Sequence, residues 1–315
     1  MNVLHITNAF PCVKQSSYGI FIKEQFQSLK KKGISCDILF INSNEKGIKE
    51  YVLFFIKNFR ITDKYNVVHF HHPYSAFLFL LFRRNKTTKF ITSFLSTLNN
   101  SGIKFISRYV FQHSDRIIVK DNEKLAEKYP KKVNYIPNGV NLELFRQIPK
   151  DECLTKLDLP NGNYVLFCSA GGTDRQQKRY DLFKETLKIA NAKYRADFKE
   201  LLLTKVEREF VPYYYNVSSV HLLTSDYEGS PNSVKEALAC NVPVVSTNVG
   251  NVKEILNSIN GCYISETNDP NELAELVFKA SHNNRIGGRK ALINNKLDME
   301  SVANKILILY EETLK

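Results

Sequence analysis

The sequence predicts an α/β protein with two domains, each built on a doubly wound parallel sheet. The chain has 315 residues, more than one hydrophobic core usually spans, so two domains are expected. Short apolar runs alternate with longer segments of helical period in both halves, which is the pattern of βαβ units. A composition of 43% hydrophobic and 24% charged residues is typical of folded globular proteins and excludes a disordered chain.

The apolar runs locate the expected strands in order. In the N-terminal half they cover residues 3–7, 35–41, 67–71, 89–92, 116–119 and 133–136, and in the C-terminal half 164–168, 201–204, 220–223, 242–246 and 261–264. Helices are expected between them, for example over 178–190, and a last helix covers 299–314. Turn-forming residues concentrate at 137–141 and 149–152. We therefore predict domains at 1–145 and 146–298, followed by a C-terminal helix, 299–315, long enough to pack across a cleft between them.

The excess of positive charge is confined to the N-terminal half. Residues 1–145 contain 22 of the 44 basic residues and 10 of the 32 acidic ones, which accounts for the whole net charge of +12. This asymmetry indicates that this half meets a polyanion or an anionic membrane surface. Residues 46–60 and 100–113 combine apolar side chains with cations, as do helices that lie on an anionic bilayer. A helix that faces the core and exposes a basic face would give the same pattern.

Several classes of protein are not expected. No apolar run approaches the roughly 20 residues that span a bilayer, and the N-terminus lacks the pattern of a secretory signal. The six cysteines form no C-x-x-C pair and fall mostly in apolar segments, which favours reduced thiols in a cytosol over disulfides or zinc. The dinucleotide-binding, P-loop, nucleophile-elbow and H-E-x-x-H motifs are absent.

Two carboxylates stand out after the predicted strand 220–223. Glu228 lies in the loop that follows this strand, and Glu236 lies in the first turns of the helix that Ser230 or Ser233 opens. This places both carboxylates at the carboxyl edge of a parallel sheet, where open α/β folds bind ligands. The free N–H groups at the helix start would favour a phosphate nearby. A local alternative is that Ser233 and Glu236 form a capping box and that Glu228 is a solvated loop acid.

The stretch from Glu228 onward, EGSPNSVKEALACNVPVVSTNVGN, resembles the E-x7-E region of family 4 retaining glycosyltransferases of the GT-B fold. Three further segments are similar to this family in the right order along nearly the whole chain. YGIFIKEQ (18–25) resembles its glycine-containing loop and helix, YIPNGVNLELF (135–145) its interdomain segment, and DRQQKRYDLFKETL (174–187) its basic loop. The resemblance implies two Rossmann-like domains that face a cleft.

The resemblance also implies roles for the residues that match on the donor side. Glu236 would bind the ribose hydroxyls of a nucleotide donor, Glu228 would lie against the transferred sugar, and Lys178 matches the lysine that binds the diphosphate. A lysine at the start of a helix is unfavourable beside the helix dipole, which also indicates function. The family's arginine directly after the strand is missing, and Arg175 or Arg179 could substitute for it. Backbone groups of the intervening loop would hold sugar or diphosphate oxygens, and its donor-binding residues are Gly229, Ser230, Pro231, Asn232 and Ser233.

The acceptor side is expected in the N-terminal domain, at Gly19, His69, His71, Phe94 and Asn138. Many family members carry a histidine after the fourth strand, but here Phe94 takes that place. Either the acceptor pocket is lined differently, or one of His69, His71 and His72 serves, or activity is reduced. These histidines lack an acidic or cysteine partner nearby, so packing or an acceptor-lining role is favoured over metal binding, and no metal is expected.

The resemblance implies a metal-independent retaining glycosyltransferase without a cofactor. It would move a sugar from a nucleotide-sugar to a saccharide acceptor, lipid-linked, in the synthesis of bacterial surface polysaccharide such as capsule or O-antigen. The expected location is cytoplasmic and peripheral on the inner face of the cell membrane, with an anionic membrane surface and no nucleic acid as partner. Alternatives are a sugar-nucleotide epimerase of the same fold, a basic protein that binds nucleic acid or membrane without catalysis, and a degenerate scaffold. The oligomeric state stays open.

Overall fold

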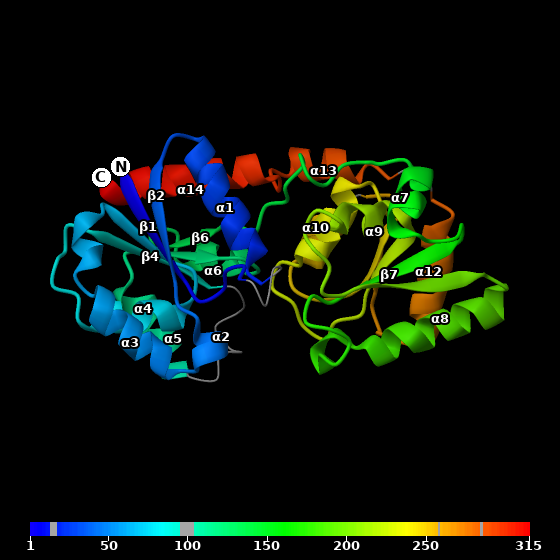
Figure 1. Cartoon of the computed structure of the whole chain (residues 1–315), viewed down its shortest axis with the longest axis horizontal. Helices are drawn as coiled ribbons and strands as arrows, with labels where there is room; N and C mark the ends of the chain where they lie inside the picture. The colour runs from blue at the N-terminus through cyan, green and yellow to red at the C-terminus, as the bar shows by residue number, and fades with distance from the viewer. Residues whose placement is uncertain (13–17, 95–103, 258, 284–285) are drawn as a thin grey trace. The chain divides into compact units, whose positions relative to one another are not determined.

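The computed structural model describes residues 1–12, 18–94, 104–257, 259–283 and 286–315, which form two compact units (Figure 1). The N-terminal unit comprises Met1–Cys12, Tyr18–Gly139 and Met299–Lys315, and the C-terminal unit comprises Val140–Asp298. The chain passes from one to the other between Gly139 and Val140, ahead of the position 145/146 that the turn formers indicate. The reason is packing, because Val140 and Phe145 are buried in the core of the C-terminal unit.

The N-terminal unit is built on a six-stranded sheet in the order β2-β1-β3-β4-β5-β6. Every pair of neighbouring strands is parallel. The strands are β1 (Asn2–Thr7), β2 (Ser35–Phe40), β3 (Val67–Phe70), β4 (Lys89–Phe94), β5 (Arg116–Val119) and β6 (Val133–Tyr135). Each coincides with a predicted apolar run, since strands covered on both faces contain few polar residues.

Helices cover both faces of this sheet. They are α1 (Ile20–Lys31), α2 (Ser43–Lys46), α3 (Lys49–Asn58), the 3-10 turn η1 (Ile61–Lys64), α4 (Pro73–Leu81), α5 (Lys104–His113), α6 (Glu123–Lys128) and α14 (Met299–Leu314). Successive strand residues point to opposite faces. Val3 therefore packs with Leu29 of α1 and Ile306 of α14. Leu4 faces the other layer, where Phe79 of α4 and the helices α3 and α5 contribute to the core.

The last helix, α14, has the extent that the sequence predicts and packs on the sheet of the N-terminal unit. Its buried residues include Val302, Ile306 and Tyr310, which recur at helical spacing on one face. They join the cluster of Val3 and Leu29, and α14 lies beside α1 (Figure 1). The end of the chain thus completes the unit in which the chain begins.

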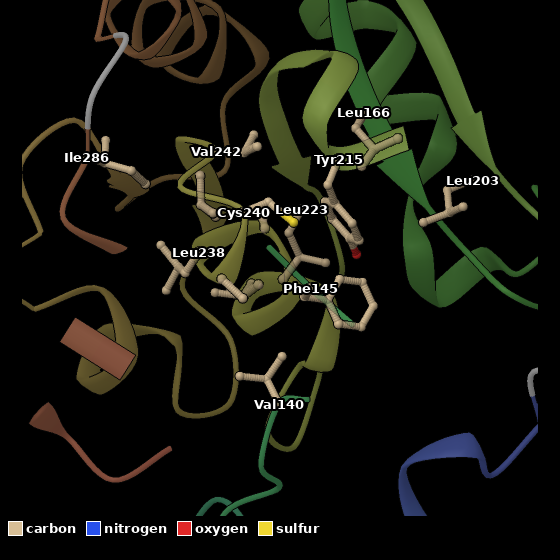
Figure 2. Packing of buried hydrophobic residues seen from close by; sticks show 14 of the residues in the cluster. Val140, Phe145, Leu166, Leu203, Tyr215, Leu223, Leu238, Cys240, Val242 and Ile286 are labelled. Carbon is tan, nitrogen blue, oxygen red and sulfur yellow. The ribbon is translucent and has the colours of Figure 1, made fainter. Parts of the chain in front are cut away.

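The C-terminal unit is built on a five-stranded parallel sheet in the order β11-β10-β9-β7-β8. The strands are β7 (Asn163–Cys168), β8 (Phe198–Leu203), β9 (Ser218–Leu223), β10 (Val244–Thr247) and β11 (Tyr263–Ser265). The helices are α7 (Lys150–Leu157), the 3-10 turn η2 (Gln176–Lys178), α8 (Tyr180–Tyr194), α9 (Val211–Val217), α10 (Asn232–Ala239), α11 (Val252–Leu256), α12 (Pro270–Ser281) and α13 (Gly288–Asn294). Phe183 of α8 and Val277 of α12 pack on one face of the sheet. Figure 2 shows the cluster on the other face, where Tyr215 and Leu238 lie.

Each sheet contains one point at which the strand order reverses. In the N-terminal unit β1 lies between β2 and β3, and in the C-terminal unit β7 lies between β8 and β9. Loops that follow the two strands at such a switch point diverge to opposite faces, and open α/β sheets bind ligands in the crevice that this leaves. The fold prediction of two doubly wound parallel-sheet domains is confirmed. The two switch points place the candidate ligand sites at the loops after β1 and β3 and after β7 and β9.

Candidate active site

The switch point of the C-terminal unit brings Lys178 and Glu228 together. Lys178 ends η2, which follows β7, and Glu228 lies in the loop after β9. Lys178 Nζ is 2.6 Å from Glu228 Oε1, and each side chain is only 14% exposed. The Ser225 hydroxyl donates to the same carboxylate oxygen at 2.7 Å. A fixed cation and a fixed carboxylate therefore share one partly shielded position, where charges interact more strongly than in open water.

Hydrogen bonds between the two loops hold Lys178 in place. The Thr224 hydroxyl donates to the backbone carbonyls of Lys178 and Arg179 at 2.9 and 3.0 Å. The Asp226 N–H donates to the Gln177 carbonyl at 2.9 Å. The helix α8 begins only at Tyr180, so the expected helix start at Lys178 is wrong. The argument from an unfavourable helix dipole therefore does not apply, and the ion pair with Glu228 accounts for this lysine.

Glu236, on α10, is buried and has two donors that the sequence did not reveal. Arg208 Nη1 is 2.7 Å from Glu236 Oε1, and the Tyr215 hydroxyl donates to Oε2 at 2.9 Å. Burial, with the charges of Cys168 and Glu236, raises the pKa of Tyr215 well above its usual value, so the phenol keeps its proton and stays a donor. No side-chain hydrogen bond caps α10. The local alternative of a Ser233–Glu236 capping box is thus not what the structure contains.

Cys168, at the end of β7, lies close enough to both carboxylates to feel their charges. Burial raises the pKa of the Cys168 thiol to about 11. The negative charge of Glu236 contributes to this rise, that of Glu228 adds to it, and the cation of Lys178 opposes it. Both carboxylates and the lysine therefore act on one strand end.

Arg208 could not be predicted from the sequence. The only general signal for it is the rule that a buried carboxylate needs a partner, and this rule does not say which residue the partner is.

The two arginines considered for the diphosphate have different surroundings. Arg179 donates to both oxygens of Asp181 and, through Nη1, to Asp226 Oδ1 at 3.1 Å. Arg175 is exposed, and its Nη2 donates to Gln177 Oε1 at 3.3 Å. Arg179 is thus engaged by two acidic side chains, whereas Arg175 has the more weakly held guanidinium.

The segment between the two glutamates is anchored at both ends. The Gly229 carbonyl accepts from the Asn251 N–H at 3.1 Å, and the Ser230 hydroxyl accepts from the buried Lys235 Nζ at 2.8 Å. Pro231 precedes the first residue of α10, and Ser233 is buried in its first turn. The Asn232 Oδ1 is buried and has no hydrogen-bond partner within the described ranges. An amide oxygen in this state is an acceptor for which a ligand hydroxyl would be a suitable donor.

We expect the Gly250→Ala variant to lose about 100-fold in the rate of any reaction that uses Glu228. Gly250 has φ of +54°, and a Cβ here would lie 2.0 Å from the Gly229 carbonyl oxygen and 2.8 Å from that of Glu228. The loop that carries Glu228 must therefore move, and a shift of about 1 Å at a reacting group costs on the order of 100-fold. Steady-state kinetics of the purified variant measure the effect.

Gly33→Ala is the matched control for this loop. Gly33 also has a left-handed φ, +80°, but a Cβ here would meet nothing within 4 Å. Both variants should lose about 1–2 kcal/mol of stability from backbone strain, and only Gly250→Ala should lose activity. Unchanged turnover in Gly250→Ala would show that the loop tolerates the displacement.

In the N-terminal unit, His69 of β3 and His71, which follows this strand, lie next to His5 of β1 at the switch point. They are 0% and 2% exposed, and burial lowers the pKa of each well below its usual value. The two nitrogens of His69 hydrogen-bond to Tyr310 (2.6 Å) and Ser93 (2.8 Å), and His71 Nε2 lies 2.9 Å from His5 Nδ1. The sequence leaves two roles open for these histidines, packing in the core and lining of the acceptor pocket. Their burial beneath α14 favours packing.

The sequence disfavours a metal at His69, His71 and His72, and the structure groups His5, in place of His72, with His69 and His71. One nitrogen of each of His5, His69 and His71 lies within 4.8 Å of the others. The rings of His69 and His71 are stacked, however, with centroids 4.2 Å apart and planes inclined by 24°. The in-plane lone pairs of stacked rings run side by side and do not converge on one ion, and both His69 nitrogens already have partners. The arrangement fits a buried hydrogen-bond network better than a ligand set.

A buried lysine, which the sequence did not single out, adjoins this network. Lys120 follows β5 and is 2% exposed, and its Nζ has no hydrogen-bond partner in the part of the chain that the structure describes. Burial lowers the pKa of Lys120 to about 7. Its charge adds to the causes that lower the pKa of His69 and His71, after burial and the neighbouring histidines. The carboxyl end of this sheet thus gathers basic groups.

The remaining acceptor-side residues lie at or after the ends of different strands of the N-terminal sheet. Gly19 precedes α1, where a Cβ would lie 2.2 Å from the Ala9 carbonyl oxygen. Phe94 is 3% exposed and packs in the core layer beneath α4 and α5. Asn138 is partly buried in the segment after β6. His72 caps α4, and burial lowers its pKa to about 4. The structure therefore places the side chain of Phe94 inside the unit.

Comparisons with known proteins agree with this architecture. Residues 163–283 match the family described as glycosyl transferases group 1. The chain is 22% identical to an uncharacterised glycosyltransferase of Methanocaldococcus jannaschii, over 98% of this chain and 93% of that protein.

Solved structures of similar fold cover both units. Sucrose-phosphate synthase from Thermosynechococcus elongatus matches with a TM-score of 0.75 and 15% identity over 99% of each chain. HepE from Anabaena in complex with UDP matches with a TM-score of 0.71 and 12% identity over 99% of this chain and 100% of that chain. A glycosyltransferase from Rickettsia africae matches with a TM-score of 0.68 and 19% identity over 100% of this chain and 99% of that chain. The chain is thus similar to glycosyltransferases in its matched domain at residues 163–283 and in its full-length relative, and it shares the GT-B type of fold with the solved structures.

Proposed function

We propose that the chain is a retaining, metal-independent glycosyltransferase that moves a sugar from a nucleotide-sugar to a saccharide acceptor. The observation that carries this proposal is the Lys178–Glu228 ion pair at the switch point of the C-terminal sheet, with Glu236 on the following helix. Carboxylates accept paired hydrogen bonds from vicinal hydroxyls, as a ribose and a hexose present them. A fixed cation stabilises a departing diphosphate.

In the proposed step, the bond from the anomeric carbon to the diphosphate oxygen breaks and a bond to the acceptor hydroxyl oxygen forms on the same face. Lys178 Nζ turns from Glu228 to the diphosphate and stabilises the charge that grows there. Glu228 stabilises the positive charge on the oxocarbenium-like sugar. An oxygen of the departing diphosphate takes the proton of the acceptor hydroxyl. No histidine base is required, so the burial of Phe94 in place of the family histidine does not prevent the reaction.

Glu236 is prepared to bind a ribose in this proposal. Arg208 and Tyr215 each donate to one of its oxygens, which fixes the rotamer of the carboxylate. An ionised carboxylate has about four lone-pair sites, so sites beyond these two contacts can accept the ribose hydroxyls. We assign Arg208 and Tyr215 as positioning residues that act through Glu236.

The proposed acceptor is a lipid-linked saccharide at the inner face of a bacterial membrane, in the synthesis of a surface polysaccharide. The support is that the whole excess of positive over negative charge lies within residues 1–145. None of the described helices is both long and apolar enough to cross a bilayer. The enzyme would therefore reach this acceptor from the membrane surface, through the N-terminal unit.

We expect a nucleoside diphosphate to raise the melting temperature of the protein. UDP is the first to test, because HepE, of the same fold, has been crystallised with it. At a concentration of 100 times Kd, binding adds about 2.7 kcal/mol of stability, which corresponds to several degrees for a unit of this size. UDP, GDP and ADP and their sugars are compared by thermal shift, and Lys178→Ala should reduce the shift by weakening diphosphate binding.

Product analysis separates transfer from the alternative reaction. An epimerase of the same fold would convert the nucleotide-sugar into its epimer with no acceptor present, whereas the proposed transferase leaves the sugar configuration unchanged. The absence of a shift with every nucleotide would contradict the donor site. Conversion without an acceptor would replace the transferase by the epimerase.

A further inference from the structure

The helix α3 is apolar on its exposed face as well as on its buried face. Its inner face packs Phe54, 8% exposed, into the core. Exposed apolar side chains on and beside the helix are Ile48 (73%), Val52 (50%), Leu53 (51%), Ile56 (60%) and Phe59 (42%). A surface helix normally presents polar residues to water, so an apolar outer face indicates a partner that the isolated chain lacks.

Ring contacts continue this apolar face across two neighbouring helices. The ring of Phe55 of α3 contacts that of Phe82, which is 60% exposed and follows α4, with centroids 5.4 Å apart. Phe77 of α4 meets Phe105 of α5, 69% exposed, at 6.4 Å. The helices α3, α4 and α5 lie side by side on one face of the sheet (Figure 1). The exposed apolar side chains thus form one surface and are not scattered singly.

Cations frame the same surface. Lys49 and Lys57 of α3 and Arg60, which follows the helix, are exposed beside Val52 and Ile56. Further exposed cations near the ends of α4 and α5 are Arg84, Lys86, Lys104 and Arg108. Two nearby acids are paired with other cations: Glu50 lies 3.5 Å from Lys46, and Asp115 lies 2.9 Å from Arg83. We call this the apolar–basic surface, formed by the exposed apolar and basic residues of α3, the end of α4 and α5.

We infer that the apolar–basic surface docks on an anionic lipid bilayer. Its apolar side chains would enter the region between headgroups and acyl chains, and its cations would meet the anionic headgroups. A second copy of this chain fits less well, because a symmetric dimer would set one basic rim against another. The lipid-linked acceptor of the proposed function is the context of this docking. Vesicle binding is nevertheless measured without donor or acceptor, so failure of the docking and failure of the transferase are distinguishable.

The experiment uses vesicles and the absence of tryptophan from the chain. Phe105→Trp places a single indole on the apolar–basic surface, and Ile308→Trp, at a residue of α14 that is 53% exposed, is the matched control. Vesicles of phosphatidylcholine with 30% phosphatidylglycerol should shift the emission of Phe105→Trp to shorter wavelength and leave that of Ile308→Trp unchanged. Pure phosphatidylcholine should give no shift, and high salt should weaken the shift with anionic vesicles.

Co-sedimentation with the same vesicles tests the side chains. Leu53→Ser together with Ile56→Ser should lower partitioning at least about 10-fold, because each removes apolar area that enters the bilayer. Ile308→Ser should partition like the unchanged chain. Equal binding to neutral and anionic vesicles, or none to either, would overturn the inference. A dimer in light scattering that Leu53→Ser and Ile56→Ser dissociate would assign the surface to a second copy of the chain instead.

Discussion

Replacement of Lys178 by alanine is expected to lower sugar transfer 100-fold or more. Lys178 is the cation closest to Glu228, with Nζ 2.6 Å from the carboxylate, and in the proposed reaction it stabilises the departing diphosphate. The loss of one fixed group that stabilises charge in a transition state costs about 10²–10³ in kcat. Glu228→Gln should cause a loss of similar size, because the amide has the shape of the carboxylate but no charge. Both variants are measured as kcat and KM with the nucleotide-sugar found by thermal shift.

The control for these variants is Lys188→Ala, which removes an exposed lysine of α8 from the same unit. It should keep normal kcat and KM. The melting temperatures of all three variants are measured as well, since removal of Lys178 leaves a partly shielded carboxylate without its cation. Turnover near that of the unchanged enzyme in both Lys178→Ala and Glu228→Gln would remove the assignment of this site.

Replacement of Lys120 by methionine is expected to stabilise the protein by about 5 kcal/mol near neutral pH. The folded-state pKa of Lys120 is about 7, below its ordinary value of 10.5. Between these values the unfolded chain binds the proton more tightly, so the free energy of unfolding of the unchanged protein rises with pH from about 7 to 10.5. At 1.36 kcal/mol for each pKa unit, the free energy of unfolding rises by about 5 kcal/mol across this window. Methionine has a similar shape but no ionisable group, so its burial does not require the release of a proton.

Urea unfolding of both proteins at several pH values measures this effect. The stability difference between Lys120→Met and the unchanged chain should be greatest near pH 7 and should disappear near pH 10.5. His69 and His71, the titratable neighbours, have lowered pKa values and stay neutral over this window. A difference that stays constant with pH would show that Lys120 is charged and compensated in the folded state.

Most of the fold could be predicted from the sequence, because strands of a parallel sheet are buried on both faces and appear as short apolar runs. The run at 220–223 became β9, and α14 has the predicted extent. The unit boundary lies several residues before the predicted one, since Phe145 packs in the core of the C-terminal unit although it follows the turn formers. Local turn chemistry indicates where the chain bends, but only packing decides to which core a side chain belongs.

The candidate site could be predicted in part. Lys178 and Glu228 follow different strands, and their contact depends on β7 and β9 being neighbours, which the resemblance implied and the residues alone did not. Arg208 and Tyr215 were missed because nothing local marks them, and they meet Glu236 only through the packing of α9 against α10. The basic stretch 46–60 left two interpretations open, a bilayer face and a core-facing helix. In the structure α3 buries one face and presents apolar side chains on the other.

The position of α14 has a consequence for how the protein is made. Val3, Val67, Ile91 and Ile118 of the first sheet share a cluster with α14, and His69 hydrogen-bonds to Tyr310. A ribosome releases residues 1–139 first, and α1 covers part of this face of their sheet, but the part that α14 covers stays exposed until 299–315 emerge. Residues 140–298 form a unit of their own and need no later segment. The part of the chain that is synthesised second can therefore fold first, while the first part waits with exposed apolar surface, which is the state in which newly made chains aggregate or need a chaperone.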